Sequence, residues 1–177
     1  MEKKIAEYKK YIDNHIANVA KVYSIYGKEL CEILGVDYER LGDMIKDHDQ
    51  SKYTKEEFEG FRCYYYPTAE EEADVESKPI RKAKYDSAWL YHLRRNAHHP
   101  EFWIYKDDEG HIRLHPMDPI HIAEMIIDWA AMGIVFGDTA YNYWHDNIHS
   151  KPLHSDSIAL VDKCIDIFKD PIPAEKL

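Results

Sequence analysis

Histidine and aspartate are the residues of this sequence whose types and spacing suggest chemistry. The chain has 11 histidines among 177 residues, and several of them lie near carboxylates. The groups that fall in or next to an apolar helical pattern are His15, the pair His48 and Asp49, His92 with His98 and His99, and Asp128. A buried imidazole or carboxylate is costly unless it is paired or binds a metal. Because ligands that project inward from facing helices form metal sites in bundles, this set predicts a transition-metal site.

The pair His48 and Asp49 gives the most specific pattern. Adjacent residues of a regular helix point about 100° apart, so both side chains reach one ion only where a helix ends. Lys52 lies four residues after His48, which lets it share that face and reach a phosphate oxygen. Two simpler interpretations stay open. Lys52 could be solvated in a polar turn, and the histidines and aspartates could be unrelated polar residues satisfied by hydrogen bonds in a helical core.

A second group of polar residues surrounds this set. His92 and His99 are seven residues apart, which places them on one helical face, with Asn96 between them as a candidate substrate contact. His98 points about 100° away from His99, and we expect His99 to be the inward-facing one. Glu124 precedes Asp128 by four residues, and we expect it to orient a ligand imidazole without contacting the metal itself. The same supporting role is predicted for His98. His121 and the loop histidines are expected to be ordinary polar residues.

The elements that must position these residues read mainly as helices. Apolar residues recur with the helical period over residues 5–34, 37–50, about 83–98, 118–133 and about 155–169. Thr54-Lys-Glu-Glu57 resembles a capping box that opens a short helix toward Phe61. Residues 70–82 read as an exposed connection, and residues 103–116 as a small hairpin around a Gly-containing turn. The sequence therefore predicts one all-α helical domain over residues 1–177 with one small hairpin.

The composition and net charge limit the classes of partner that the protein can bind and its expected location in the cell. A net charge of −10 argues against binding to duplex nucleic acid but permits a small phosphorylated substrate near metal ions. Three scattered cysteines without a C-x-x-C pair make a disulfide framework and a thiolate zinc site unexpected. Neither a run of about 18 apolar residues nor an apolar N-terminal segment is present, so we expect a cytoplasmic protein that does not enter a membrane. A monomer and a homodimer are both compatible with the sequence.

Aromatic and arginine residues have two interpretations each. The aromatic set could stack on a nucleobase or simply pack between helices, and the second is favoured because large aromatics dominate cores. Its members are Tyr64, Tyr65, Tyr66, Trp89, Trp103, Trp129, Tyr143 and Trp144. Arg62 is predicted to bind substrate phosphate, as Arg94 or Arg95 could, although surface solvation is the simpler interpretation for one of the adjacent pair.

The ordered polar set resembles the HD superfamily of metal-dependent phosphohydrolases. That family has a His in a first helix, a His-Asp pair ending a second helix, and a later Asp in a further helix. This chain has His15-Ile-Ala-Asn-Val-Ala, then His48-Asp49-Gln-Ser-Lys52, then Met125-Ile-Ile-Asp128-Trp. The resemblance runs from about residue 12 to 133. It departs from the family over an insert at about 58–83. The sequence has no GYP triplet, so specificity for a cyclic dinucleotide is not indicated.

The resemblance implies an HD-like helical bundle and a metal-dependent hydrolase. A first metal ion would be held by His15, His48, Asp49 and Asp128. His92 and His99 would hold a second ion or donate to a phosphate. The ions would be one or two divalent cations of manganese, iron, cobalt, nickel or zinc. Asp49 would orient a metal-activated water and Lys52 would bind phosphate, so that a nucleotide or another small phosphate ester is hydrolysed.

Two other functions stay open at this stage. Some HD-fold relatives use four His and two Asp on two irons for oxygen chemistry, and the same six residues would form that set here. A non-catalytic protein that binds a metal or a nucleotide is the third possibility.

Overall fold

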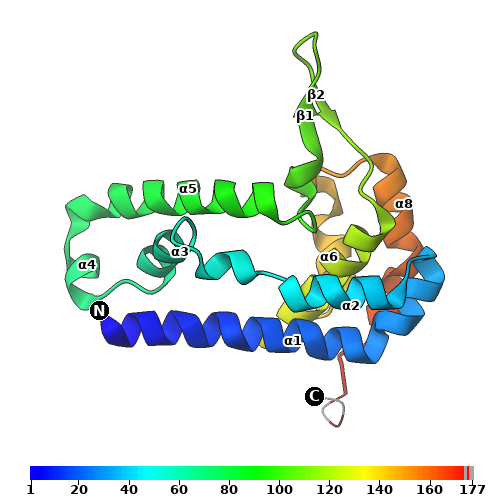
Figure 1. Cartoon of the computed structure of the whole chain (residues 1–177), viewed down its shortest axis with the longest axis horizontal. Coiled ribbons are helices and arrows are strands. Elements are labelled where there is room, and N and C mark those ends of the chain that lie inside the picture. The colour runs from blue at the N-terminus through cyan, green and yellow to red at the C-terminus, as the bar shows by residue number, and fades with distance from the viewer. Residues whose placement is uncertain (174, 176–177) are drawn as a thin grey trace. The chain divides into compact units, whose positions relative to one another are not determined.

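The chain folds into helices with one small hairpin, as the sequence predicts. The computed structural model describes residues 1–173 and 175, and within them it contains eight α-helices and a single two-stranded antiparallel sheet (Figure 1). The described chain divides into two compact units, each built from separate stretches. Unit 1 comprises Met1–Ile16 and His48–Asn96, and unit 2 comprises Ala17–Asp47 and Ala97–Leu177. The prediction of a single domain stays a prediction.

Unit 1 contains the first part of helix α1 (Glu2–Leu34) and the helices between residues 50 and 95. These are η1 (Gln50–Tyr53), α3 (Phe58–Tyr65), α4 (Ala69–Ala73), η2 (Val75–Ser77) and α5 (Lys78–Arg95). Its core consists of Tyr8, Ile12, Phe61 and Ala88, with aromatic rings packed around them. Helices α3 and α5 lie side by side (Figure 1).

The close approach of α3 to α5 explains why residue 60, on α3, is a glycine. A Cβ on Gly60 would lie 2.5 Å from the Lys84 carbonyl oxygen and 2.5 Å from the Ala88 Cβ. Such distances are far below van der Waals contact, so only glycine fits without moving a helix. The same packing draws His92, on the last turn of α5, into the interior of unit 1, where it is 1% exposed.

Unit 2 has its own larger core. It contains the rest of α1, α2 (Tyr38–Asp47), η3 (Pro100–Trp103), β1 (Ile104–Lys106), β2 (Ile112–Leu114), α6 (Pro119–Phe136), α7 (Ala140–Asn147), η4 (Ile148–Ser150), α8 (Ser155–Cys164) and η5 (Ile165–Phe168). Strands β1 and β2 pair with Tyr105 opposite Arg113. Helix α6 supplies eleven buried residues, Ile122 and Ile126 among them. The core of unit 2 therefore forms around α6.

Helix α6 is also long and apolar enough to cross a membrane, judged by length and composition. However, 61% of it is buried within the protein. A core helix passes the same test, so this is weak evidence for a membrane segment. The expectation that the chain does not enter a membrane stays a prediction.

Several element boundaries differ from the sequence prediction. The helix predicted at 83–98 begins at Lys78 and ends at Arg95, and the connection predicted over 70–82 contains α4 and η2. The capping box forms at Thr68 and Glu71 instead of at Thr54 and Glu57. Helix α7 was not predicted at all. The missed helices α4, η2 and α7 are short, and their apolar pattern spans too few turns to show a period.

Candidate metal centre

Asp49 is the residue on which the polar side chains of unit 1 converge. It directly follows His48, precedes η1, and is 2% exposed. Its backbone is left-handed, with φ 58° and ψ 11°, and it is the only non-glycine residue with positive φ in the described part of the chain. Aspartate tolerates this conformation better than most residues, but it still carries a cost that surrounding structure must offset. Strain of this kind is typical of functional sites.

Three imidazoles face the two Asp49 carboxylate oxygens. His15 Nε2 on α1 lies 3.1 Å from Oδ2, and His48 Nε2 lies 3.6 Å from the same oxygen. His92 Nε2 on α5 lies 3.4 Å from Oδ1. All four side chains are buried, and His15, His48 and Asp49 each offer a ligand atom within 4.8 Å of the others. Buried His and Asp groups so arranged can hold a metal ion, because imidazole nitrogen and carboxylate oxygen are common transition-metal ligands.

Glu57 fixes the orientation of the His92 ring. Its Oε2 lies 2.9 Å from His92 Nδ1, and the Ser51 hydroxyl donates to the same oxygen at 2.9 Å. In the tautomer in which Nδ1 donates to this carboxylate, the Nε2 lone pair of His92 faces Asp49 Oδ1. His92 Nε2 and Asp49 Oδ1 lie 3.4 Å apart, and a cation bound by both atoms would stabilise this pair of acceptors. The residues present therefore fit a metal ion, with the carboxylate–histidine pair that metal sites commonly use.

Asn96 supports the same arrangement. It ends α5, and its Nδ2 donates to the Ser51 hydroxyl at 3.0 Å and to the His92 carbonyl at 2.8 Å. The amide thus links Ser51 and His92 through two hydrogen bonds within the protein. Its predicted contact with a substrate stays a prediction.

Lys52 supplies positive charge at the centre. Its Nζ lies 2.5 Å from Asp49 Oδ2, and its side chain is 14% exposed. Burial raises the pKa of Asp49, but the charge of Lys52 and the contacts with His48, His15 and His92 together hold that pKa well below its usual range. Asp49 is therefore an anion in the folded protein, which a metal ligand must be.

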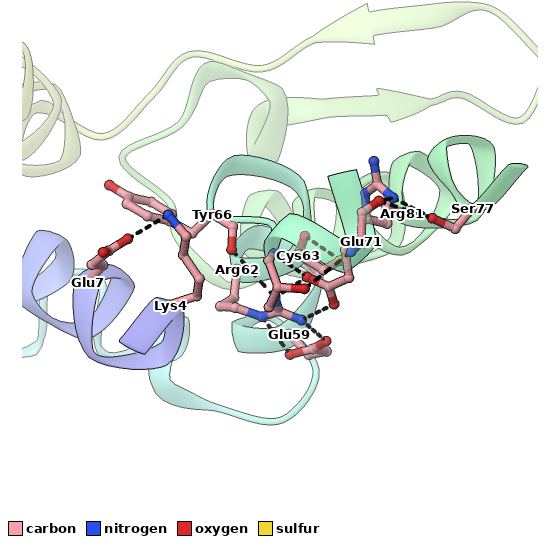
Figure 2. A network of polar contacts seen from close by, with 11 residues as sticks. Lys4, Glu7, Glu59, Arg62, Cys63, Tyr66, Glu71, Ser77 and Arg81 are labelled. Atoms are coloured by element: carbon pink, nitrogen blue, oxygen red, sulfur yellow. Dashed lines mark hydrogen bonds and ion pairs between the residues drawn. The ribbon is translucent and has the colours of Figure 1, made fainter. Parts of the chain in front are cut away.

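Arg62 has a structural role in place of the predicted substrate contact. Its side chain is fully buried, and its Nη1 and Nη2 donate to the two Glu71 oxygens at 2.6 and 2.8 Å (Figure 2). Nη2 and Nε also donate to Glu59 at 2.6 and 3.2 Å, and Nη1 reaches the Tyr66 carbonyl at 3.4 Å. These five contacts use the five N–H donors of the guanidinium, so none is left for a phosphate.

The other predicted site residues belong to unit 2. His98 is 2% exposed, and its Nδ1 lies 3.3 Å from Glu124 Oε1, while His121 Nδ1 lies 3.5 Å from Glu124 Oε2. Glu124 thus contacts two imidazoles, in keeping with an orienting role. Asp128 lies one turn further along α6 and is half-buried. Its predicted role as a ligand stays a prediction.

His99 does not share a helical face with His92, contrary to the sequence argument. Helix α5 ends at Arg95, and His99 has an extended backbone with φ −87° and ψ 131°. The following Pro100 explains this, because the residue before a proline is disfavoured in helical conformation. His98 is the buried member of the pair and His99 is only half-buried. The expectation that His99 faces inward therefore loses its helical basis.

Glu57 is the site residue that the sequence analysis missed. Its position three residues after Thr54 is typical of a capping box, and that local pattern hid its contact with His92, 35 positions later. The structure instead buries the carboxylate completely. A Glu placed before a short apolar segment gives no sequence signal for such a distant partner.

Fold and site together define an all-α protein with a buried His/Asp cluster able to hold a metal ion. Comparison with protein-family models assigns residues 4–167 to DUF5662, a family of unknown function. Because the match spans most of the chain, the protein belongs to this family. No curated protein and no solved structure matches the chain.

Proposed function

We propose that this protein is a metal-dependent phosphohydrolase that acts on a small phosphate ester, such as a nucleotide. The observation that carries the proposal is the convergence of His15, His48, His92 and Lys52 on Asp49 within unit 1. Three imidazoles and a carboxylate are suited to a divalent transition metal, and the adjacent ammonium is suited to a phosphate oxygen. The order of these residues along the chain also resembles the HD superfamily.

Each residue of the cluster has a separate task in this proposal. His15, His48, His92 and Asp49 would hold the metal, which supplies Lewis acidity and an activated water when bound. Asp49 keeps its negative charge and can orient a water through the oxygen it does not use as a ligand. Glu57, which also accepts from Ser51, would orient the His92 ring for binding.

Lys52 would bind the phosphate. Its ammonium contacts Asp49 directly, yet its side chain is partly exposed, whereas Asp49 is not. A lysine in this position can exchange part of its contact with Asp49 for a phosphate oxygen of an entering substrate. The net charge of −10 makes this local cation important, because an anionic ester must otherwise approach an acidic protein.

The experiment is a hydrolysis panel with the purified full chain. The protein is loaded separately with Mn²⁺, Co²⁺, Ni²⁺, Zn²⁺ and Fe²⁺ and assayed for phosphate release from nucleotides, sugar phosphates and aryl phosphates. We expect turnover with at least one metal, abolished by Asp49→Ala and reduced at least tenfold in kcat/KM by Lys52→Met. The exposed Lys46→Met serves as a matched control that retains activity.

Three results would contradict the proposal. Absence of phosphate release with every metal and substrate would exclude hydrolysis and favour a binding protein. Turnover that survives Asp49→Ala would place the chemistry elsewhere. Two equivalents of iron with oxygen consumption, in place of phosphate release, would favour the oxygenase alternative.

A further inference from the structure

A pocket of about 160 Å³ lies in unit 2 at the carboxyl end of helix α6. It is bounded by the last turns of α6, the start of α7 and the residues that follow η5. An apolar cavity of about 150 Å³ holds benzene, so this pocket accommodates a ligand of roughly six non-hydrogen atoms. Apolar residues supply much of its lining: Ala130, Ile134, Ala140, Phe168, Pro171 and Ile172.

The titratable side chains that line this pocket are both acidic. They are Asp138, which follows the C-cap of α6, and Asp170, which follows η5, and no basic residue joins them among the described residues of the lining. Both aspartates are exposed, so a ligand from solvent can reach them. Asp138 Oδ1 accepts hydrogen bonds from Thr139 N at 2.8 Å and from Asn142 Nδ2 at 3.0 Å. These bonds hold the Asp138 carboxylate in place at the rim.

Nearby lysines of unit 2 do not neutralise this rim. The Lys169 ammonium lies 5.5 Å from the centre of the Tyr141 ring, over its face. Lys163 donates to the Ile33 carbonyl at 2.6 Å. Two carboxylates beside an apolar pocket therefore lack a matching cation from these side chains.

The main chain adds negative potential at the same place. Helix α6 has 18 residues and ends at Phe136, with Gly137 in left-handed conformation at its C-cap. The last carbonyl groups of a helix lack partners within it, and the helix dipole favours cations at this end. Thr139, which also lines the pocket, accepts from Asn142 N at 3.0 Å, and its hydroxyl oxygen has a second lone pair for a donor.

We propose that this pocket binds a small organic ammonium ion, a primary alkylamine of about six non-hydrogen atoms. The alkyl chain packs against Ile134 and Phe168, and the ammonium binds Asp138 and Asp170 at the rim. A neutral ligand of the same size gains only the apolar contacts, and an anion is repelled. The site is independent of the proposed phosphohydrolase function, because none of the proposed metal ligands is among its lining residues.

The test compares three ligands with six non-hydrogen atoms each but different charge. Calorimetry on the full chain, at pH 7 in an amine-free buffer of low ionic strength, measures binding of n-pentylamine, 1-pentanol and butanoate. We expect the amine to bind about tenfold more tightly than the alcohol, as a charge-assisted contact predicts, and butanoate not to bind. Removing metal with a chelator should leave amine binding unchanged.

Variants locate the bound amine. The double variant Asp138→Asn/Asp170→Asn should lose the tenfold preference for the amine and bind 1-pentanol like the parent protein, because asparagine has nearly the same shape as aspartate. Asp146→Asn, an exposed position on α7 outside the lining, is the control matched for charge and should retain the preference. Melting temperatures followed by circular dichroism verify that all variants fold.

Three results would overturn this inference. Equal binding of amine and alcohol would show that the carboxylates do not recognise a cation. An amine preference that survives the double variant, or that Asp146→Asn removes equally, would show general attraction to an acidic protein. Absence of amine binding at millimolar concentration would show that the pocket is not a ligand site, and the phosphohydrolase proposal would still stand.

Discussion

At the scale of single residues, Glu57 is expected to control the metal affinity of the candidate centre. It contacts His92 and orients that ring, although Glu57 itself is not a proposed ligand. We predict that Glu57→Gln lowers metal affinity about 10- to 100-fold, because the amide no longer fixes the proton on His92 Nδ1. Competition with a chromophoric chelator measures this directly. Glu56→Gln, one residue earlier, is the matched control and should bind metal like the parent protein. Equal affinity of the two variants would show that Glu57 does not orient the imidazole.

The predictability of the site also follows from particular residues. His15, His48, Asp49 and Lys52 could be found because their spacing along two helices is a local pattern. Glu57 could not, because its contact with His92 on α5 joins segments that are far apart in the sequence. The sequence analysis predicted that Arg62 binds substrate phosphate. The sequence alone does not show that Glu59 and Glu71 accept hydrogen bonds from the Arg62 guanidinium.

At the scale of elements, the packing of α3 on α5 depends on Gly60. We predict that Gly60→Ala lowers the free energy of unfolding by about 1–3 kcal/mol, because the new methyl group meets the Lys84 carbonyl at 2.5 Å and the helices must move apart. Urea denaturation followed by circular dichroism measures the change. An unchanged or higher stability, as expected for alanine in an unconstrained helix, would contradict this account of the interface.

The junction between α3 and α4 depends on Arg62 and Glu71. The hydrogen bonds from Arg62 lower the pKa of Glu71 from 4.5 to about 2. Because the folded-state pKa lies below the unfolded value, the stabilisation is fully present above about pH 4.5 and disappears as pH falls toward 2. We predict that Glu71→Gln costs about 2 kcal/mol at pH 7 and progressively less below pH 4.5.

Denaturation curves between pH 7 and pH 3 measure this difference. Glu72→Gln in the same helix is the control and should follow the parent protein throughout. A Glu71→Gln penalty that stays constant over this range would show that the charge of Glu71 is not the stabilising feature.

Helix prediction succeeded where the apolar pattern was long. Helices α1, α2, α6 and α8 and the hairpin all lie where the sequence places them, with Gly35 in left-handed conformation just after α1. Helices α4 and α7 have five and eight residues, too few for a period to be distinguished from chance. The sequence analysis ended this helix at about residue 98 because Pro100 disfavours a helical backbone at His99. That restriction acts on His99 alone, so it does not indicate that α5 ends at Arg95.

At the scale of the whole molecule, the cluster around Asp49 lies within one of two compact units. Metal binding stabilises only the folded state, so removing the ion should lower the melting temperature of the full chain, and restoring it should reverse the loss. We predict that hydrogen exchange after chelation rises most within residues 48–96, which contain His48, Asp49 and His92. A rise confined to residues 97–173 would contradict this location.

The measurement that tests the central claim most directly is elemental analysis of the freshly purified chain beside the double variant His48→Ala/Asp49→Ala. We predict at least one equivalent of a divalent transition metal in the parent protein and none in the variant, with both helical by circular dichroism. A parent protein that contains no metal and takes up none on incubation would contradict the claim. A variant that keeps its full metal content would contradict it equally, because the ion would then lie elsewhere.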